Sequence, residues 1–216
     1  MTIKNNLQKI KNSLPKKVTL VAVSKTKPIE DLMEAYKAGQ RIFGENKVQE
    51  IVNKHPQMPL DTKWHMIGHL QRNKVKYLAP FIDLIHGIDS LKLLKEINKQ
   101  AIKHDRIIKG LIQIKISNEI TKFGMTAEEA REMFYSKEFK TLNNIKIIGV
   151  MGMASFTTNK SQIKKEFLNL KLIFDSYKEF NPTMEVISMG MSGDYNLAIE
   201  CGSNMIRIGS SIFGIR

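Results

Sequence analysis

The sequence has little of several features that mark particular protein classes. It contains one cysteine, Cys201, in 216 residues, so it can form no intramolecular disulfide and suits a reducing compartment. Residues 1–14 alternate lysine and asparagine with isolated apolar residues, which is unlike the continuous apolar centre of a secretory signal. No apolar run approaches the roughly 18 residues that span a bilayer. These absences predict a soluble, cytoplasmic protein with no membrane segment.

The sequence also has fewer acidic than basic residues. The chain has 34 Lys and Arg against 21 Asp and Glu, a formal net charge of +13. Such an excess can mark proteins that bind nucleic acid or anionic surfaces. However, the lysines are spread from Lys4 to Lys178 without a long run of like charge, and no zinc-finger or RNA-binding signature is present. We therefore expect solvated helix faces and no specific nucleic-acid partner.

Short apolar segments of strand length alternate along the chain with longer amphipathic segments of helical length. The strand candidates are Val18–Ser24, Arg41–Phe43, Trp64–Ile67, Ile82–His86, Leu111–Ile116, Ile145–Met151, Met184–Ser188 and Met205–Ile208. The helical candidates include Ile29–Ala38, Ser90–His104, Ala127–Ser136, Ser161–Tyr177 and Tyr195–Cys201, and a further helix, Ile3–Ser13, precedes the first strand. Each connection is too long for a hairpin, so the strands are predicted to pair in parallel.

The number of strand–helix units selects the architecture. Eight such units match the number that closes a TIM (β/α)8 barrel. The alternative is an open, doubly wound sheet, but residues 24–28 (SKTKP) after the first strand lack the glycine fingerprint of a dinucleotide site. No linker rich in Pro, Gly or Ser interrupts the chain. The sequence therefore predicts an α/β protein whose residues 1–216 form a single-domain TIM barrel with an extra N-terminal helix.

In such a barrel the functional residues follow the carboxyl ends of the strands. On the first strand Val21, Val23 and Lys25 share one face, because side chains alternate along a strand. If the valines fill the barrel, Lys25 points into its mouth, where an amine could form a Schiff base with a carbonyl compound. The alternative is that Lys25 and Lys27 are ordinary solvated lysines that flank a turn, and this alternative is favoured before any family resemblance is considered, because most lysines lie at the surface.

The last strand places an arginine on the inward face by the same reasoning. Met205, Arg207 and Gly209 share one face, and the two isoleucines between them suit the side that faces the helices. A guanidinium inside a barrel keeps its proton and needs an acceptor or a negative partner. An acidic side chain of the protein or a bound ligand would meet that need, and the pattern leaves both open.

Small residues follow the seventh and eighth strands. Residues 188–194 (SMGMSGD) and 207–214 (RIGSSIFG) are neither a Walker loop nor a Rossmann fingerprint. The loops at these positions of TIM barrels often bind phosphate, because backbone N–H groups and serine hydroxyls can approach an anion there. Together the two segments predict an anion site.

The histidines and the cysteine predict no chemistry of their own. His65 and His69 would lie about 13 Å apart on an extended strand, too far to share a metal ion. Cys201 falls in a predicted helix without a histidine constellation, which indicates a small core residue. We expect no metal site.

Taken together, these segments resemble a known family. Over essentially its whole length the sequence resembles the pyridoxal phosphate homeostasis protein family, whose barrel is similar to the N-terminal domain of alanine racemase. The resemblance is carried by AVSKTKP (22–28), FGENKVQE (43–50), WHMIGHLQRNK (64–74), SMGMSGD (188–194) and IRIGSSIFG (206–214).

The resemblance implies a role for each matching residue toward pyridoxal 5'-phosphate. Lys25 matches the lysine that holds the cofactor as a Schiff base, and Arg207 matches the arginine that faces the pyridine nitrogen. The matching phosphate-binding positions are Ser192, Gly209 and Ser210. Asn46 resembles a pocket residue near the cofactor.

The sequence departs from the family pattern at a few positions. Arg72 replaces a small residue, Lys47 stands where an aromatic is frequent, and Asn204 stands where serine or threonine is common. The N-terminal arm is also short. None of these departures touches the implied phosphate contacts, although Arg72 leaves a partner surface or second ligand nearby in question.

The implied function is to carry the cofactor without using it for turnover. An arginine opposite the ring nitrogen is a poor proton donor, which disfavours transamination and decarboxylation. Racemisation of the alanine racemase type needs a second base from an additional C-terminal domain, and the chain ends directly after the eighth unit. We therefore expect no catalytic residue and a cytoplasmic, monomeric protein that buffers pyridoxal phosphate or delivers it to apo-enzymes that depend on it. A minimal pyridoxal phosphate-dependent amino-acid racemase is the alternative.

Overall fold

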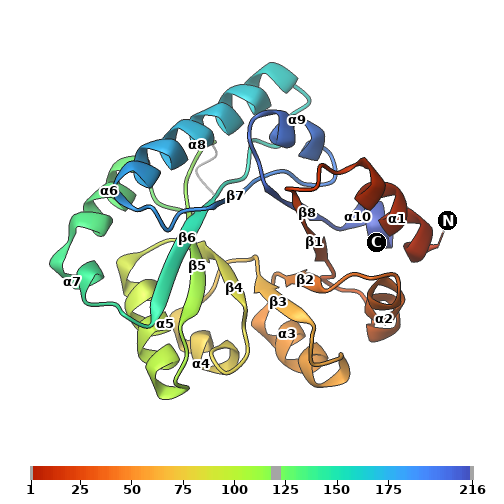
Figure 1. The fold of residues 1–216 in the computed structure, drawn as a ribbon, viewed down its shortest axis with the longest axis horizontal. Helices are drawn as coiled ribbons and strands as arrows, with labels where there is room; N and C mark the ends of the chain where they lie inside the picture. The colour runs from red at the N-terminus through yellow and green to blue at the C-terminus, as the bar shows by residue number, and fades with distance from the viewer. Residues whose placement is uncertain (1, 118–122, 215–216) are drawn as a thin grey trace.

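Eight parallel strands form a closed barrel in chain order, in a computed structural model that describes residues 2–117 and 123–214 (Figure 1). The strands are β1 (Thr19–Val23), β2 (Ile42–Glu45), β3 (Lys63–Met66), β4 (Leu84–Ile88), β5 (Ile108–Gln113), β6 (Ile145–Met151), β7 (Val186–Ser188) and β8 (Met205–Ile208). β1 pairs with β8 in register from Thr19 opposite Met205 to Ala22 opposite Ile208, and this pairing closes the barrel. The predicted (β/α)8 barrel is therefore confirmed.

Helices surround the barrel on its outer side (Figure 1). They are α1 (Ile3–Ser13), α2 (Ile29–Lys37), α3 (Val48–Lys54), α4 (Val75–Leu78), α5 (Leu91–Lys103), α6 (Ala127–Tyr135), α7 (Lys137–Lys140), α8 (Lys160–Phe180), α9 (Tyr195–Glu200) and α10 (Ser210–Phe213). Two 3-10 turns, His55–Gln57 and Arg72–Lys74, lie next to α3 and α4. Within the described ranges, no helix has both the length and the apolarity needed to cross a membrane.

Local sequence signals explain where several helices begin. Thr126 caps α6 by accepting the Glu129 N–H (3.1 Å), and the Glu129 carboxylate accepts the Thr126 N–H (2.8 Å). Asn159 caps α8 through its side-chain oxygen, which accepts the Gln162 N–H. At the other end of the chain, the Asn6 amide donates to the Ile212 carbonyl (3.1 Å), which joins the extra N-terminal helix α1 to α10.

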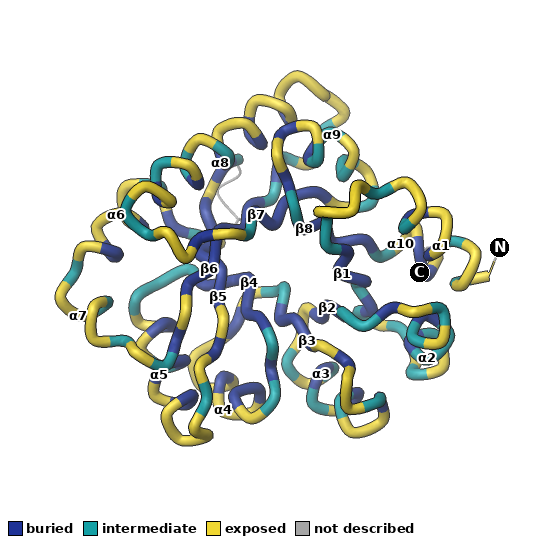
Figure 2. The backbone as a smooth tube through the Cα atoms, viewed as in Figure 1, coloured by how far each residue is buried: buried dark blue, intermediate teal, exposed yellow. Residues whose placement is uncertain are grey.

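The apolar residues divide into two layers, as the alternation of side chains along strands requires. The interior of the barrel holds a cluster formed by Val21, Leu84, Leu111, Ile148, Met151 and Met205. The neighbouring residues Leu20, Ala22, Ile206 and Ile208 belong instead to the larger cluster between the strands and the helices. The backbone is correspondingly buried along the strands and exposed on the outer sides of the helices (Figure 2). The predicted facing of the first and last strands is confirmed.

Some strand boundaries differ from the predicted ones. The fifth strand was predicted at Leu111–Ile116, but β5 covers Ile108–Gln113, and beyond it Ile114 forms only an isolated bridge with Met125. The alternation of apolar and polar residues runs on past Gln113, which made the predicted strand end too late. Similarly, β4 begins at Leu84 and extends to Ile88, past the predicted His86. The shift of β5 matters because it moves Gln113 to the mouth of the barrel.

Candidate functional site

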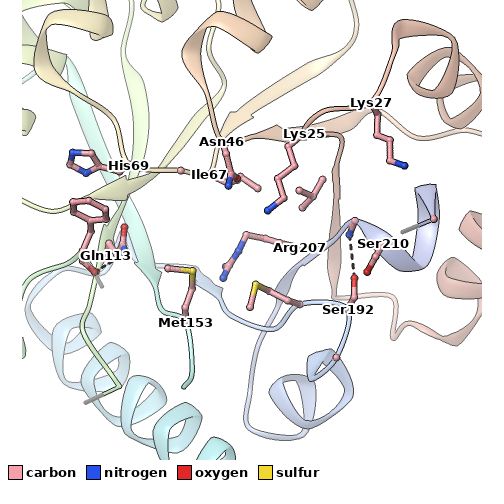
Figure 3. A pocket seen from close by; sticks show the side chains of 17 residues that line it. Lys25, Lys27, Asn46, Ile67, His69, Gln113, Met153, Ser192, Arg207 and Ser210 are labelled. Atoms are coloured by element: carbon pink, nitrogen blue, oxygen red, sulfur yellow. Dashed lines mark hydrogen bonds between the residues drawn. The ribbon is translucent and has the colours of Figure 1, made fainter. Parts of the chain in front are cut away.

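A cavity of about 610 Å³ opens at the carboxyl ends of the strands (Figure 3). Its lining includes every residue that the sequence predicted for cofactor binding, namely Lys25, Asn46, Ser192, Arg207, Gly209 and Ser210. These residues come from the segments after β1, β2, β7 and β8 and from β8 itself. The structure therefore brings together side chains that are far apart in the sequence.

Lys25 lies two residues beyond the end of β1, on the face that Val21 and Val23 share. Val21 is fully buried inside the barrel and Val23 lines the cavity, so the alternation carries the lysine into the mouth. Figure 3 shows its side chain reaching into the cavity near Asn46 and Arg207. Its amine makes no hydrogen bond or ion pair with any residue that the structure describes, which leaves it available to a ligand.

Arg207 lies on β8 and is 4% exposed. Its guanidinium donates to the Ser188 carbonyl (2.9 Å), the Ser188 hydroxyl (2.6 Å) and the Gly152 carbonyl (3.1 Å). Burial lowers the pKa of Arg207 to about 10, and the charge of Asp194 acts in the opposite direction. The group therefore stays charged at neutral pH. Within the described residues its partners are carbonyl and hydroxyl oxygens, with no acidic side chain among them.

A chain of buried polar groups runs from Arg207 into the barrel. His86 Nδ1 lies 3.1 Å from the Ser188 hydroxyl, and His86 Nε2 lies 3.0 Å from His65 Nδ1. Arg207 only donates, and no other acceptor for the Ser188 hydroxyl proton lies among the described residues, so Ser188 donates to His86. His86 in turn donates to His65. This series of hydrogen bonds orients the groups behind Arg207, and no pattern in the sequence predicted it.

Both histidines are neutral because they are fully enclosed. Burial lowers the pKa of His65 to about 3, with a smaller contribution from Lys63. Burial also lowers the pKa of His86 far below its usual value, and the nearby His65 and Arg207 add to the effect. Their role is to satisfy each other and Ser188 inside the barrel. The burial of His65 agrees with the prediction that it is a packing or hydrogen-bonding residue.

The segments after β7 and β8 form one side of the cavity. The Gly209 N–H lies 3.4 Å from the Ser192 hydroxyl oxygen, and Ser210 begins the short helix α10. A Cβ added to Gly209 would lie 3.1 Å from the Val23 carbonyl, so a side chain there would crowd β1. Gly190 has a φ of 97°, which favours glycine at the start of the other segment.

The composition of the lining suits a negatively charged ligand. Lys25, Lys27 and Arg207 supply positive charge, and Ser192 and Ser210 supply hydroxyls. No carboxylate side chain is among the described residues of the lining. An anionic group would therefore find donors on this side of the cavity without repulsion. A phosphate-bearing aldehyde fits the residues present, since the amine of Lys25, which contacts no partner in the described part of the chain, lies in the same cavity.

The opposite side of the cavity contains residues that the sequence did not predict for the site. His69 Nδ1 donates a hydrogen bond to the Asp89 carboxylate (3.0 Å to Oδ2), and the His69 ring stacks on Phe123 with ring centroids 4.0 Å apart. The Gln113 amide donates to the Phe123 carbonyl (2.8 Å). The fifth strand was predicted to end at Ile116, so Gln113 was expected inside a strand and neither Gln113 nor Phe123 was expected at the barrel mouth. A strand end set at the glutamine would have pointed to this side.

The remaining candidates are possible metal ligands and Cys201. Within residues 2–117 and 123–214 no group of three or more potential ligands is placed to hold a metal ion. Cys201 is 3% exposed, and burial raises the pKa of its thiol, so it is a core residue without nucleophilic character.

The fold and the cavity define a TIM-barrel protein with a lysine-bearing, anion-accepting cavity at the carboxyl ends of its strands. The family model of the alanine racemase N-terminal domain matches residues 1–216. The chain is also 39% identical over 200 residues to the pyridoxal phosphate homeostasis protein of Aquifex aeolicus, covering 91% of this chain and 86% of that protein. The chain belongs to the pyridoxal phosphate homeostasis protein family, within the alanine racemase N-terminal domain group.

Solved structures agree with this assignment. PipY of Synechococcus elongatus, without pyridoxal phosphate, superposes with a TM-score of 0.93 at 32% identity, covering 99% of this chain and 100% of that one. The same protein with pyridoxal phosphate bound gives a TM-score of 0.90 at 31% identity, with the same coverage. An alanine racemase of Clostridium difficile shares the fold, with a TM-score of 0.83 at 17% identity over all of this chain and 57% of that one.

Proposed function

We propose that the chain binds pyridoxal 5'-phosphate in the cavity at the barrel mouth and serves pyridoxal phosphate homeostasis by buffering or delivering it. The observation that carries the proposal is the Lys25 amine, which has no hydrogen-bond or ion-pair partner among the described residues and shares one cavity with the donor-rich segments after β7 and β8. The name of the Aquifex aeolicus relative and the pyridoxal phosphate bound to PipY support the same ligand.

Each predicted residue has a part in this proposal. Lys25 supplies the amine that condenses with the ligand aldehyde, so that a Schiff base forms and water leaves. Ser192, Ser210 and the Gly209 N–H hold the phosphate, because they line the side of the cavity that lacks carboxylates. Asn46 lies beside Lys25 and bounds the ligand from the β2 side (Figure 3).

Arg207 favours holding the ligand over catalysis with it. When bound, pyridoxal phosphate stabilises carbanions, and it does so best when its ring nitrogen is protonated. Arg207 keeps its own proton at neutral pH, since its pKa is about 10, and its position is fixed by Ser188 and Gly152. It therefore offers a hydrogen bond to the ring nitrogen without transferring a proton, which leaves the ligand a weak electron sink.

The lining also offers few groups that can act as a second acid or base. Tyrosine, cysteine and carboxylate side chains are missing from the described part of the lining. His69 and Lys27 are the exceptions, and the contact of His69 with Asp89 favours the alternative function, a minimal amino-acid racemase. We rank this alternative second because Arg207 opposes the carbanion that racemisation requires.

The wider setting follows from the same proposal. Protein acceptors would be apo-enzymes that depend on pyridoxal phosphate, and the chain would act as a cytoplasmic monomer. The buried Cys201 suits a reducing compartment.

The near-visible absorption spectrum with added pyridoxal phosphate tests the ligand. The parent chain is expected to develop the band of a Schiff base, and Lys25→Ala is expected to lose it. Lys37→Ala removes an exposed lysine of α2 and serves as the matched control, which should keep the band. A parent that develops no band, or a Lys25→Ala variant that keeps it, contradicts the proposal.

An amino-acid racemisation assay separates the two functions. The loaded parent is expected to show no turnover above that of pyridoxal phosphate free in solution. Turnover that disappears in both Lys25→Ala and His69→Asn would instead establish the racemase.

A further inference from the structure

The turn that carries Lys25 is held from outside the barrel by three charged side chains that the proposed function does not use. They are Glu45 at the end of β2 and Glu50 and Lys54 of α3, which we call the clamp. Glu45 is fully buried and Lys54 is 9% exposed. The clamp lies outside the cavity, since none of its members is part of the lining.

Lys54 is the centre of the clamp. Its ammonium donates to the Ser24 carbonyl (2.9 Å), to Glu45 Oε1 (2.8 Å) and to Glu50 Oε2 (3.1 Å). An ammonium group has three protons, so all its donors are used. One of them goes to the peptide group that joins Ser24 to Lys25.

The two carboxylates hold the turn on either side of Lys25. The Ser24 hydroxyl donates to Glu45 Oε1 (2.7 Å), and the Thr26 N–H donates to Glu50 Oε2 (2.6 Å). Both neighbours of the lysine are therefore fixed to the same cluster. Lys25 itself contributes no contact to it, so its side chain is left to the cavity.

The conformation of the turn explains why it needs such support. Thr26 has a φ of 64°, in the left-handed region that a β-branched residue rarely adopts. A left-handed residue directly after Lys25 reverses the chain, and the Lys27 N–H closes the turn on the Ser24 carbonyl (3.1 Å). Without an acceptor for its N–H, Thr26 would relax toward an ordinary conformation, and the Lys25 backbone would turn with it.

Stability alone does not account for the clamp. Burying charged groups costs free energy that their mutual attraction often fails to recover. One buried oxygen, Glu45 Oε2, also lacks a hydrogen-bond partner among the described residues. The contacts that the clamp makes outside itself are instead concentrated on residues 24 and 26, next to the lysine.

We propose that Glu45, Glu50 and Lys54 are positioning residues that aim the Lys25 amine at the ligand aldehyde, and that they set the rate of Schiff base formation. This inference rests on the proposed function, in which Lys25 is the attachment lysine. It concerns geometry only: the amine nitrogen bonds to the aldehyde carbon and water leaves, and the clamp takes no part in that exchange.

Glu50 offers the sharpest test, because its side chain is 21% exposed and is less buried than those of Glu45 and Lys54. Glu50→Ala removes the acceptor of the Thr26 N–H, whereas Glu50→Gln keeps an oxygen at the same place. Glu132→Ala, on the exposed face of α6, is the control. The measurement is the rate at which Lys25 is trapped by borohydride after pyridoxal phosphate is added, followed by peptide mass spectrometry.

The inference predicts that Glu50→Ala slows trapping by about tenfold or more, since small misplacements of a reacting group cost up to about a hundredfold. Glu50→Gln is expected to restore most of the rate. Amide exchange at Thr26 in the ligand-free protein should accelerate in Glu50→Ala alone. Trapping by a small aldehyde that needs no alignment, formaldehyde, should change far less than trapping by pyridoxal phosphate.

The outcomes separate the two proposals. A parent that is never trapped at Lys25 overturns the proposed function and this inference with it. A parent that is trapped, together with Glu50→Ala trapped at the parent rate, overturns the clamp and leaves the proposed function standing. Equal slowing in Glu50→Ala and Glu50→Gln would also overturn it, because the acceptor oxygen would then be irrelevant.

Discussion

The carboxyl group of Glu45 is enclosed between β2 and α3, where water cannot solvate its charge. This burial raises the pKa of Glu45 from 4.5 to about 7, although hydrogen bonds from Lys54 and Ser24 act in the opposite direction. Glu45→Gln removes the titration and keeps an oxygen for both donors. The variant therefore isolates the effect of one buried carboxyl group on the pH dependence of folding.

The sign and size of the effect follow from the two pKa values. The folded chain binds the Glu45 proton more tightly than the unfolded chain, so the stability that this group contributes is complete below pH 4.5 and lost as the pH rises through 7. Each pKa unit corresponds to about 1.4 kcal/mol, which gives a total of about 3 kcal/mol. About 2.5 kcal/mol of it is lost between roughly pH 5 and pH 8.5.

Urea unfolding at these two pH values measures the effect. Trp64, the single tryptophan of the sequence, is 1% exposed and reports the transition by its fluorescence. Relative to the parent, Glu45→Gln is expected to gain about 2.5 kcal/mol between the lower and the higher pH, or about 1 M in the urea midpoint. The titrations of His65 and His86 are common to both chains and cancel in the comparison.

The exposed substitution Glu132→Gln is the control, and its difference from the parent should not depend on pH. If the difference between Glu45→Gln and the parent stays constant within about 0.5 kcal/mol, the raised pKa of Glu45 is wrong. If Glu45→Gln is more stable than the parent at the lower pH and less stable at the higher pH, the pKa of Glu45 is lowered in the folded chain instead of raised.

Further predictions concern the ligand, one backbone position and the buried histidines. Ser192→Ala is expected to weaken pyridoxal phosphate binding by about 10- to 100-fold through the loss of a hydrogen bond to a charged group, and an unchanged Kd in a spectroscopic titration refutes this role. Gly190→Ala is expected to cost about 1–3 kcal/mol, because its φ is 97° and the new Cβ would lie 2.6 Å from Ala198 Cβ, whereas a Cβ at Gly193 meets nothing within 4 Å. Equal Tm values for Gly190→Ala and Gly193→Ala would contradict this predicted loss of stability at Gly190. His65 has a pKa of about 3 against an ordinary 6.5, so the stability that it contributes is present above pH 6.5 and lost as the pH falls. Between roughly pH 7 and pH 4, the free energy of unfolding of His65→Gln should therefore fall by about 3 kcal/mol less than that of the parent. Parallel plots of unfolding free energy against pH for the two chains would refute this.

Much of the fold follows from patterns that are local in the sequence. Strand–helix alternation predicted the barrel, and the bounds of β6, β8 and α1 agree with the predicted segments. The end of β5 was wrong because alternation continues beyond Gln113, while the hydrogen bonds of the ladder do not. Where a strand stops depends on its neighbours in the barrel, which no local pattern contains.

The predicted site residues were within reach for a similar reason. The parity of β1 and β8 placed Lys25 and Arg207 on the inward faces, and the closed barrel then brought them into one cavity. Their roles toward pyridoxal phosphate stay a proposal. The acceptors of Arg207 could not be predicted, because they include the backbone carbonyls of Ser188 and Gly152, which carry no signature in the sequence. The clamp around Lys54 was hidden likewise, since its contacts cross between elements.

The most direct test of the central claim is to add pyridoxal phosphate to the parent chain, reduce it with borohydride, and locate the label by peptide mass spectrometry after digestion. The Schiff base becomes a stable secondary amine, so the modified lysine can be located among the many lysines of the sequence. We predict one equivalent of label on Lys25 at low ligand concentration. Label on Lys27, or label spread over exposed lysines with none enriched on Lys25, would contradict the assignment of the cavity as the pyridoxal phosphate site.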